Sequence, residues 1–240
     1  MEDFYQTHAL FRTQDILDYF TSVRSMQTKL KALIEVGRIA KIKNGLYATV
    51  NPLTGDVFAS RFEIASALFE NACVAYHSAL EFHGLGNQMF SEVQVFTEKR
   101  YNPFTYNGLE YKFFSYTAKG GIMRLEQNAE IVVTDLERTV VDCIDRIDLA
   151  GGLEELVTAL NGITHLDEQA LLSYLKEYNK KFVYKKTEFL LSLLKKDLLS
   201  QNFFDICKQN CSKKQEDISE NKKMPRKRIS IGDLCIQKNL

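Results

Sequence analysis

The chain has 240 residues, 45% of them hydrophobic, and its 31 lysines and arginines balance its 31 aspartates and glutamates. A chain of this length can bury a substantial core and divide into two domains. Because no apolar run approaches a membrane-spanning length and the N-terminus is polar and acidic, we expect a cytoplasmic protein with no membrane partner. The five cysteines are scattered, which favours reduced thiols over disulfides.

Two helices are expected first. The shorter one, over residues 13 to 20, begins at Thr13 as its cap and gathers Ile16, Leu17 and Phe20 on one face. The next begins at Thr21 or Ser22 and ends before Gly37, a residue suited to a left-handed C-terminal position. Its apolar face consists of Val23, Met26, Leu30, Leu33 and Ile34. This order is typical of a helix-turn-helix.

A basic β-hairpin is predicted directly after the second helix. Asn44-Gly45 favours a type I′ turn, because both residue types tolerate positive φ angles. Alternation along the preceding strand predicts that Lys41 and Lys43 point to the same, outward face. Helices and hairpin together indicate a winged helix-turn-helix DNA-binding domain over residues 1 to 52.

Positive charge is concentrated between residues 21 and 50, where six cations face the single anion Glu35, so the local charge is 6 − 1 = +5 on a neutral chain. A recognition helix places its first residues against base edges, while nearby cations contact phosphates. About five phosphate contacts would give a log-log salt slope near −4.5. The alternative is a solvated basic face on a domain that binds protein. For binding to double-stranded DNA we predict base contacts from Arg24, Gln27 and Thr28 and phosphate contacts from Lys29, Lys31, Arg38, Lys41 and Lys43.

A second domain is predicted over residues 57 to 207, after a linker at residues 51 to 56. Apolar spacing indicates helices over residues 61–70, 73–82 and most of 151–208, and alternation indicates strands over 93–98, 109–116 and 129–133. Thr134 and Glu137 fit a capping box that opens a helix through Arg146. The expected fold class is therefore α+β, a winged helix-turn-helix followed by a mixed α/β domain with a small sheet and a helical bundle. Residues 208–240 read as a polar, basic, mobile tail.

Signals for catalysis are weak, so we expect no enzyme, no cofactor and no metal. His77 and His83 are interpreted as structural, and Arg138 with Asp142 as a structural ion pair. The alternative is a metal-dependent nuclease, because Glu98, Glu110 and Lys112 resemble the acidic-acidic-lysine set of such enzymes. An exposed Glu-Lys pair on an edge strand explains the last two residues equally well.

Three motifs, in this order, resemble the AbiEi family of antitoxins from type IV toxin-antitoxin and abortive-infection systems. They are Lys43-Asn-Gly-Leu-Tyr-Ala48, His77-Ser-Ala-Leu-Glu-Phe-His-Gly-Leu85 and Thr134-Asp-Leu-Glu-Arg-Thr-Val-Val-Asp142. The resemblance implies a transcriptional autorepressor that binds inverted repeats in its own promoter through the winged domain. It also implies a second domain that counteracts a nucleotidyltransferase-like toxin in phage defence. A protein-interaction module that binds the toxin directly remains an alternative.

Overall fold

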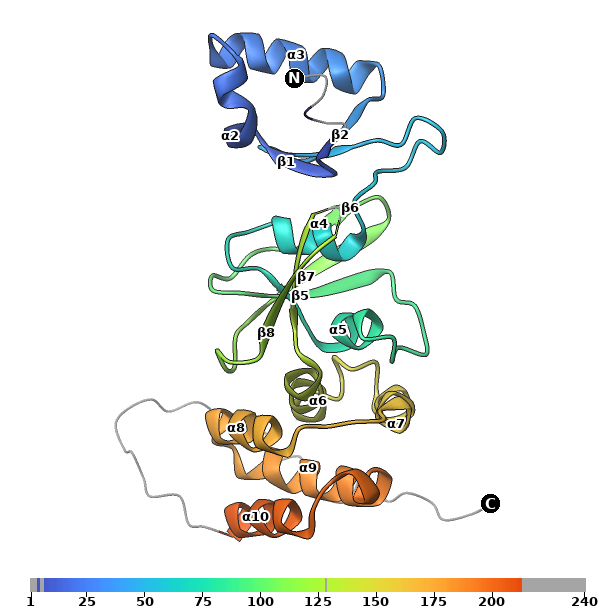
Figure 1. Cartoon of the computed structure of the whole chain (residues 1–240), viewed down its shortest axis with the longest axis vertical. Coiled ribbons are helices and arrows are strands. Elements are labelled where there is room, and N and C mark those ends of the chain that lie inside the picture. Colours follow the sequence, from blue (N-terminus) through green and yellow to red (C-terminus); the bar gives the residue numbers. More distant parts are fainter. Residues whose placement is uncertain (1–3, 5–6, 128, 213–240) are drawn as a thin grey trace, which may run out of the picture.

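The computed structural model describes residues 4, 7–127 and 129–212 and has the α+β fold class expected. Figure 1 shows an elongated molecule with three tiers along its long axis. An N-terminal helix-and-hairpin unit lies at one end, a mixed sheet in the middle, and a layer of helices at the other end. No helix within the described ranges is long and apolar enough to cross a membrane.

The N-terminal unit contains a three-stranded antiparallel sheet in the order β1-β3-β2. The first predicted helix is shorter than expected, because its α-helical turn gives way to a 3-10 turn at Leu17. Thr13 is its first residue rather than its cap, and β1 was not predicted. The elements are β1 (Leu10–Arg12), α2 (Thr13–Ile16), η1 (Leu17–Tyr19), α3 (Val23–Glu35), β2 (Ile39–Lys43) and β3 (Leu46–Thr49).

Helix α3 begins and ends where its sequence predicts. The Ser22 side chain accepts a hydrogen bond from the Ser25 N–H, which caps the first turn. At the other end, Gly37 has φ of 68°, and the N–H groups of Gly37 and Arg38 donate to the Ile34 and Leu33 carbonyls. The buried face packs in a cluster formed by Phe11, Ile16, Met26, Leu30, Leu33, Ile39 and Tyr47.

The hairpin after α3 differs from its prediction. Gly45 has φ of 78° but Asn44 is outside the positive-φ region, so the turn is not type I′. A register shift in β2 places Lys41 opposite Tyr47 but Lys43 opposite Leu46. Tyr47 and Leu46 lie in different core clusters, so the prediction that Lys41 and Lys43 share a face is wrong. The extra residue of a bulge reverses side-chain alternation.

The middle tier is a six-stranded mixed sheet in the order β6-β7-β5-β4-β9-β8. Strands β5 and β7 are parallel, as are β4 and β9, and the other neighbours are antiparallel. The three predicted strands are present, but β4, β6 and β8 were missed. Part of the helix predicted over residues 73–82 is strand β4. The elements are α4 (Arg61–Ala67), β4 (Cys73–Val74), α5 (Tyr76–Phe82), β5 (Glu92–Thr97), β6 (Phe104–Tyr106), β7 (Leu109–Ser115), β8 (Ile122–Glu126) and β9 (Glu130–Thr134).

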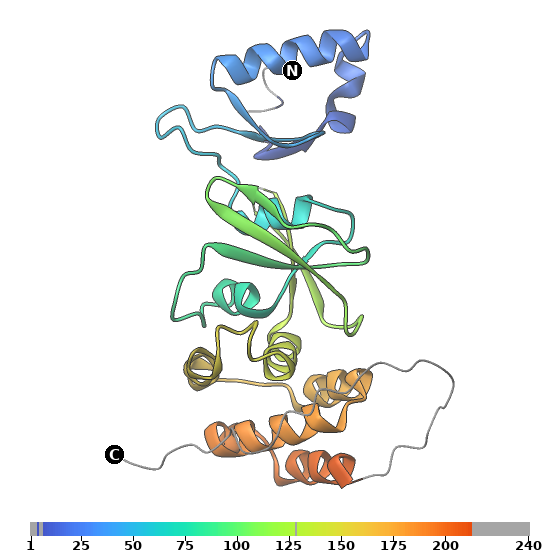
Figure 2. The ribbon, with the colours of Figure 1, turned by 180° about the vertical axis from the view of Figure 1, so that it is seen from behind.

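The last tier is helical, as predicted, and Figure 2 shows it from behind. Its first helix is capped by Asp135, whose side chain accepts from the Arg138 N–H at 2.8 Å, so the predicted Thr134 capping box is wrong by one residue. Thr134 instead ends β9. The tail was predicted from residue 208, but residues 208–212 are the end of a helix, so the prediction is wrong there. Residues 213–240 lie outside the described residues. The elements are α6 (Leu136–Asp145), α7 (Leu153–Gly162), α8 (Glu168–Tyr178), α9 (Lys181–Leu194), η2 (Lys196–Leu198) and α10 (Gln201–Ser212).

The predicted linker, residues 51–56, lies between β3 and α4 and forms a closed turn. Val50 and Val57 form an antiparallel bridge, and the Asn51 N–H donates to the Asp56 carbonyl at 2.7 Å. The two units also share one core cluster, in which Ile42 and Leu46 of the hairpin join Ile64 and Leu68 of the α4 region. Shared burial of apolar surface resists independent motion of the two units.

Candidate nucleic-acid interface

The outer face of α3 carries the residues predicted to read bases. Arg24, Gln27, Thr28 and Lys31 are exposed, while Lys29 is half-buried on the flank of the helix. Thr28 donates its hydroxyl to the Arg24 carbonyl at 3.0 Å, a bond that leaves its oxygen able to accept from outside. This helix lies at the extreme end of the molecule, away from the helical tier (Figure 1).

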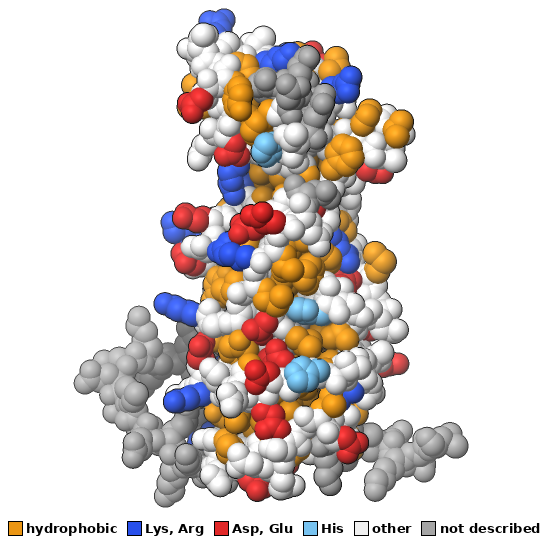
Figure 3. All heavy atoms as spheres, in the orientation of Figure 1, with side chains coloured by type: hydrophobic (Ala, Val, Ile, Leu, Met, Phe, Trp, Pro, Cys, Tyr) orange, Lys and Arg blue, Asp and Glu red, His pale blue; other side chains and the backbone are white. Residues whose placement is uncertain are grey.

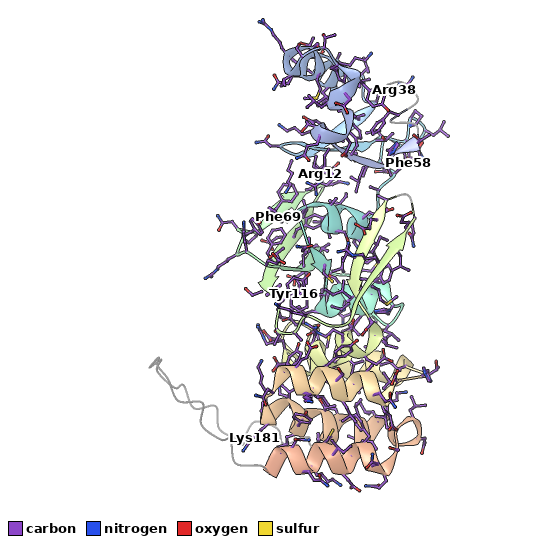
Figure 4. The ribbon with its side chains drawn as sticks, turned by 60° about the vertical axis from the view of Figure 1, so that its left-hand side comes forward. Arg12, Arg38, Phe58, Phe69, Tyr116 and Lys181 are labelled. Atoms are coloured by element: carbon purple, nitrogen blue, oxygen red, sulfur yellow. The ribbon has the colours of Figure 1, made fainter. Side chains whose placement is uncertain are left out.

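Most of the predicted cations have no competing contact within the protein. In the part of the chain that the structure describes, the side chains of Arg24, Lys29, Arg38 and Lys41 have no hydrogen-bond or ion-pair partner. Lys31 lies 3.9 Å from Glu35, but both side chains are well exposed, and such a pair adds little in water. These five cations are therefore available to a ligand. Figure 4 shows Arg38 in the N-terminal unit, and Figure 3 shows Lys and Arg side chains at that end.

Lys43 occupies a different environment from the other predicted phosphate contacts. Its ammonium donates to the Leu68 carbonyl and lies 3.8 Å from the centre of the Phe69 ring. Burial, followed by repulsion from Arg12, lowers the pKa of Lys43. Arg12 itself donates to the Ala67 carbonyl at 2.7 Å, between the two units (Figure 4). Both cations satisfy carbonyls at the C-terminal end of α4, where a helix favours positive charge.

The residues of the nuclease alternative do not come together. Lys112 lies 2.5 Å from Glu92 and 3.4 Å from Glu110. Strands β5 and β7 are parallel with Glu92 opposite Glu110, so Glu98, which follows β5, lies at the other end of the sheet. There it accepts a hydrogen bond from Asn71. Sequence analysis missed Glu92 as the ion-pair partner of Lys112, because the two residues become neighbours only through the register of β5 and β7.

His77 and His83 contact other residues of the fold, which agrees with their interpretation as structural histidines. The His77 ring lies 3.0 Å from a Glu155 oxygen and 3.8 Å from one of Glu81, on opposite sides of the imidazole. His83 lies 2.8 Å from the Thr134 carbonyl oxygen. Among the described residues, no three His, Cys, Asp or Glu side chains are arranged to hold a metal ion. The four described cysteines, Cys73, Cys143, Cys207 and Cys211, are free thiols.

Comparisons with known proteins reach only the level of the fold. No family model matches the chain, and no curated protein matches it. Among solved structures, it is similar to the RV2827C protein from Mycobacterium tuberculosis, with a TM-score of 0.60 and 13% sequence identity. The similarity covers 86% of this chain and 78% of that one. At 13% identity, this similarity shows a common fold and no more.

Proposed function

We propose that the chain is a DNA-binding autorepressor and antitoxin of a type IV toxin-antitoxin system, in which the N-terminal unit acts as a winged helix-turn-helix. The observation that carries the DNA-binding half is the capped helix α3, whose outer face presents Arg24, Gln27 and Thr28 at one end of the molecule. A helix exposed in this way can enter a major groove. The antitoxin half is supported by the three AbiEi-like motifs.

In this proposal, Arg24, Gln27 and Thr28 contact base edges. Phosphate contacts come from Lys29 and Lys31 on α3 and from Arg38 and Lys41 beside it. Lys43 is left out, because its ammonium is held by Leu68 and Phe69. With about four phosphates neutralised instead of five, the log-log salt slope of binding should be near −3.6.

Fluorescence anisotropy with the protein's own promoter fragment tests the DNA-binding half. The double variant Arg24→Ala/Lys31→Ala should lose specific binding, because it removes a base contact and a phosphate contact while leaving the α3 core intact. The control is Lys119→Ala/Lys176→Ala, which removes two exposed lysines from the other tiers. It loses the same two positive charges as the α3 variant and should bind like the wild type. Equal affinities of the two variants would rule out α3 as the recognition helix.

Growth rescue tests the antitoxin half separately. The proposal predicts that the neighbouring gene encodes a nucleotidyltransferase-like toxin, and the chain should restore growth of cells that express that toxin. Expressed from an unrelated promoter, the Arg24→Ala/Lys31→Ala variant should rescue as well as the wild type, since it changes only the DNA-binding face. Rescue by neither protein would refute antitoxin activity while leaving the DNA-binding result intact.

A further inference from the structure

A cleft lies beside the ends of strands β5 and β7 in the middle tier. Its volume is about 500 Å³, a size typical of small-molecule sites. Glu98 directly follows β5, and Ser115 is the last residue of the parallel strand β7. The space outside the carboxyl ends of parallel strands is where open α/β sheets bind ligands. We call this space the β7 cleft, and its lining includes Asn71, Glu98, Tyr116, Lys119, Ile122 and Arg124.

The loop that carries Lys119 is fixed on both sides of that residue. The buried Arg138 donates to the carbonyls of Gly120 and Ala118, at 2.8 Å and 3.1 Å. The Lys119 N–H donates to Glu177 of α8 at 3.0 Å. The Lys119 side chain is exposed, and its ammonium has no hydrogen-bond or ion-pair partner within the described ranges. Because the backbone is held before a ligand arrives, less entropy is lost on binding.

A second cation, Arg124 of β8, lines the same cleft. Its Nη1 lies 2.9 Å from Glu130, but both side chains are exposed, and such a pair contributes little in water. The other guanidinium N–H groups remain available to a ligand. Ile122 lies two residues before Arg124 on the same strand, so the two side chains share a face of the sheet. An ammonium and a guanidinium beside an apolar wall suit a ligand with a phosphate group.

The Tyr116 ring gives the cleft a flat wall. One face of the ring stacks on Phe96, with centroids 5.1 Å apart, and its hydroxyl donates to the Asn71 carbonyl at 2.7 Å. These contacts fix the ring in the middle tier, where Figure 4 shows it. The Asn71 side chain donates to one oxygen of Glu98 at 3.2 Å, and the other oxygen has no partner in the described part of the chain. Stacking suits a planar base, and a free carboxylate oxygen suits a hydroxyl or amino donor.

We propose that the β7 cleft binds a nucleotide. Lys119 and Arg124 contact the phosphate. The base stacks on Tyr116, while Glu98 accepts a hydrogen bond from a ribose hydroxyl or a base amino group. Inorganic phosphate would use only the two cations, and an uncharged nucleoside would use only the aromatic and carboxylate walls. The site lies in the middle tier, away from α3, so this inference goes beyond the proposed function and does not rest on it (Figure 1).

Isothermal calorimetry on the full chain tests this assignment. The probes are ATP, GTP, CTP and UTP, the corresponding monophosphates and nucleosides, and inorganic phosphate. At least one nucleotide should bind with a Kd below about 1 mM. It should also bind at least about tenfold more tightly than its nucleoside and than phosphate, because each of these makes only part of the contacts.

Variants of the two walls locate the bound nucleotide. Lys119→Ala should weaken its binding about tenfold, because a charge-assisted hydrogen bond is lost, and Lys119→Arg should preserve most of the affinity. Tyr116→Leu should weaken binding about fivefold or more, whereas Tyr116→Phe keeps the stacking face and should stay within about threefold of the wild type. The control Lys185→Ala removes the same charge from an exposed lysine of α9 and should bind nucleotide like the wild type.

Thermal unfolding of each variant, measured in parallel, shows that it is folded. Absence of binding by every nucleotide would overturn the site. So would nucleotide binding that Lys119→Ala and Tyr116→Leu leave unchanged, since the ligand would then lie elsewhere. Phosphate that binds as tightly as the best nucleotide would overturn the base contact and with it the nucleotide assignment. A wild-type chain that binds nucleotide but not its promoter would count against the α3 proposal and leave the β7 cleft unaffected.

Discussion

Arg138 holds Asp142 through both carboxylate oxygens in the interior of the second domain. The Arg138 Nε lies 2.9 Å and 3.0 Å from the two oxygens, and the side chains are 1% and 0% exposed. Arg138 also donates to the Gly120 and Ala118 carbonyls, and Tyr178 donates its hydroxyl to Asp142. Burial raises the pKa of Asp142 to about 6, although Arg138 and Tyr178 act in the opposite direction. The pair thus joins α6 to α8 and to the segment before β8.

Removal of one partner from this ion pair should be costly. Arg138→Met should lower the free energy of unfolding by about 3–5 kcal/mol, because it leaves the Asp142 carboxylate buried without its counterion. Urea unfolding followed by circular dichroism measures the change. The control is Lys31→Met, which breaks the exposed Lys31–Glu35 pair of the same i, i+4 spacing and should change stability by less than about 1 kcal/mol. Similar losses for both variants would contradict a stabilising role for the buried pair.

Glu155 should make stability depend on pH. Burial of its carboxylate tends to raise the pKa, but hydrogen bonds from His77 and from the Asn87 and Gln88 N–H groups outweigh burial and lower it. A carboxyl with a lower pKa in the folded state stabilises the protein above its unfolded pKa. That contribution is lost as pH falls through the folded value.

The comparison of wild type with Glu155→Gln isolates this effect. The difference in unfolding free energy should stay constant from neutral pH to about pH 5 and shrink as the pH falls below about 4.5. Urea unfolding at a series of pH values provides the measurement. Glu154→Gln, at the exposed neighbouring position, should leave stability nearly unchanged at neutral pH. A wild-type advantage that grows towards pH 3 would show that the assigned direction of the shift is wrong.

The features that sequence predicted well are local. Helix α3 begins at the cap formed by Ser22 with Ser25 and ends where the Gly37 and Arg38 N–H groups donate to carbonyls of its last turn. All of these partners lie three to five positions apart in the sequence, so the signal is local. The strand over residues 109–116 was predictable for the same reason, because apolar and polar side chains alternate along consecutive residues. The helical tier likewise follows from apolar spacing within each segment. The exposure of Arg24 and Gln27 was therefore predictable from the period of the helix.

The features that sequence missed depend on distant partners. Strand β4 is two residues long and exists because it pairs with β5 on one side and β9 on the other. Tyr76, two residues after the end of β4, has φ of 50°, a conformation that no propensity favours in a tyrosine. The bulge that separates Lys41 from Lys43 is set by pairing with β3 and by packing on α4. None of these contacts leaves a periodic signal in the sequence.

The bulge predicts opposite effects for two neighbouring lysines. If Lys41 makes the proposed phosphate contact, Lys41→Ala should weaken promoter binding and reduce the magnitude of the salt slope by about 0.9, with little change in stability because the side chain is exposed. Lys43→Ala should leave the slope unchanged but lower the free energy of unfolding by about 1–3 kcal/mol, because it removes the bond to Leu68 and the contact with Phe69. Anisotropy titrations over several salt concentrations and urea unfolding separate the two. A smaller slope in Lys43→Ala would restore that residue to the DNA-binding face.

Gly121 should be the least replaceable of the glycines on which the second domain depends. Its φ is 71°, and an added Cβ would lie 2.7 Å from the Arg138 Cβ and 2.8 Å from the Tyr174 Cζ. Gly121→Ala should therefore combine backbone strain of about 1–2 kcal/mol with an overpacking cost of about 1–3 kcal/mol. Gly55→Ala is the matched control, because its φ is 79° but no atom lies within 4 Å of the added Cβ. Thermal and urea unfolding should show strain alone in Gly55→Ala. Tyr174 donates a hydrogen bond to Asp135 at 2.5 Å and Arg138 donates one to Asp142, so neither neighbour can move aside without breaking its own contact. Equal losses of unfolding free energy in the two variants would mean that these contacts yield more easily than their geometry implies.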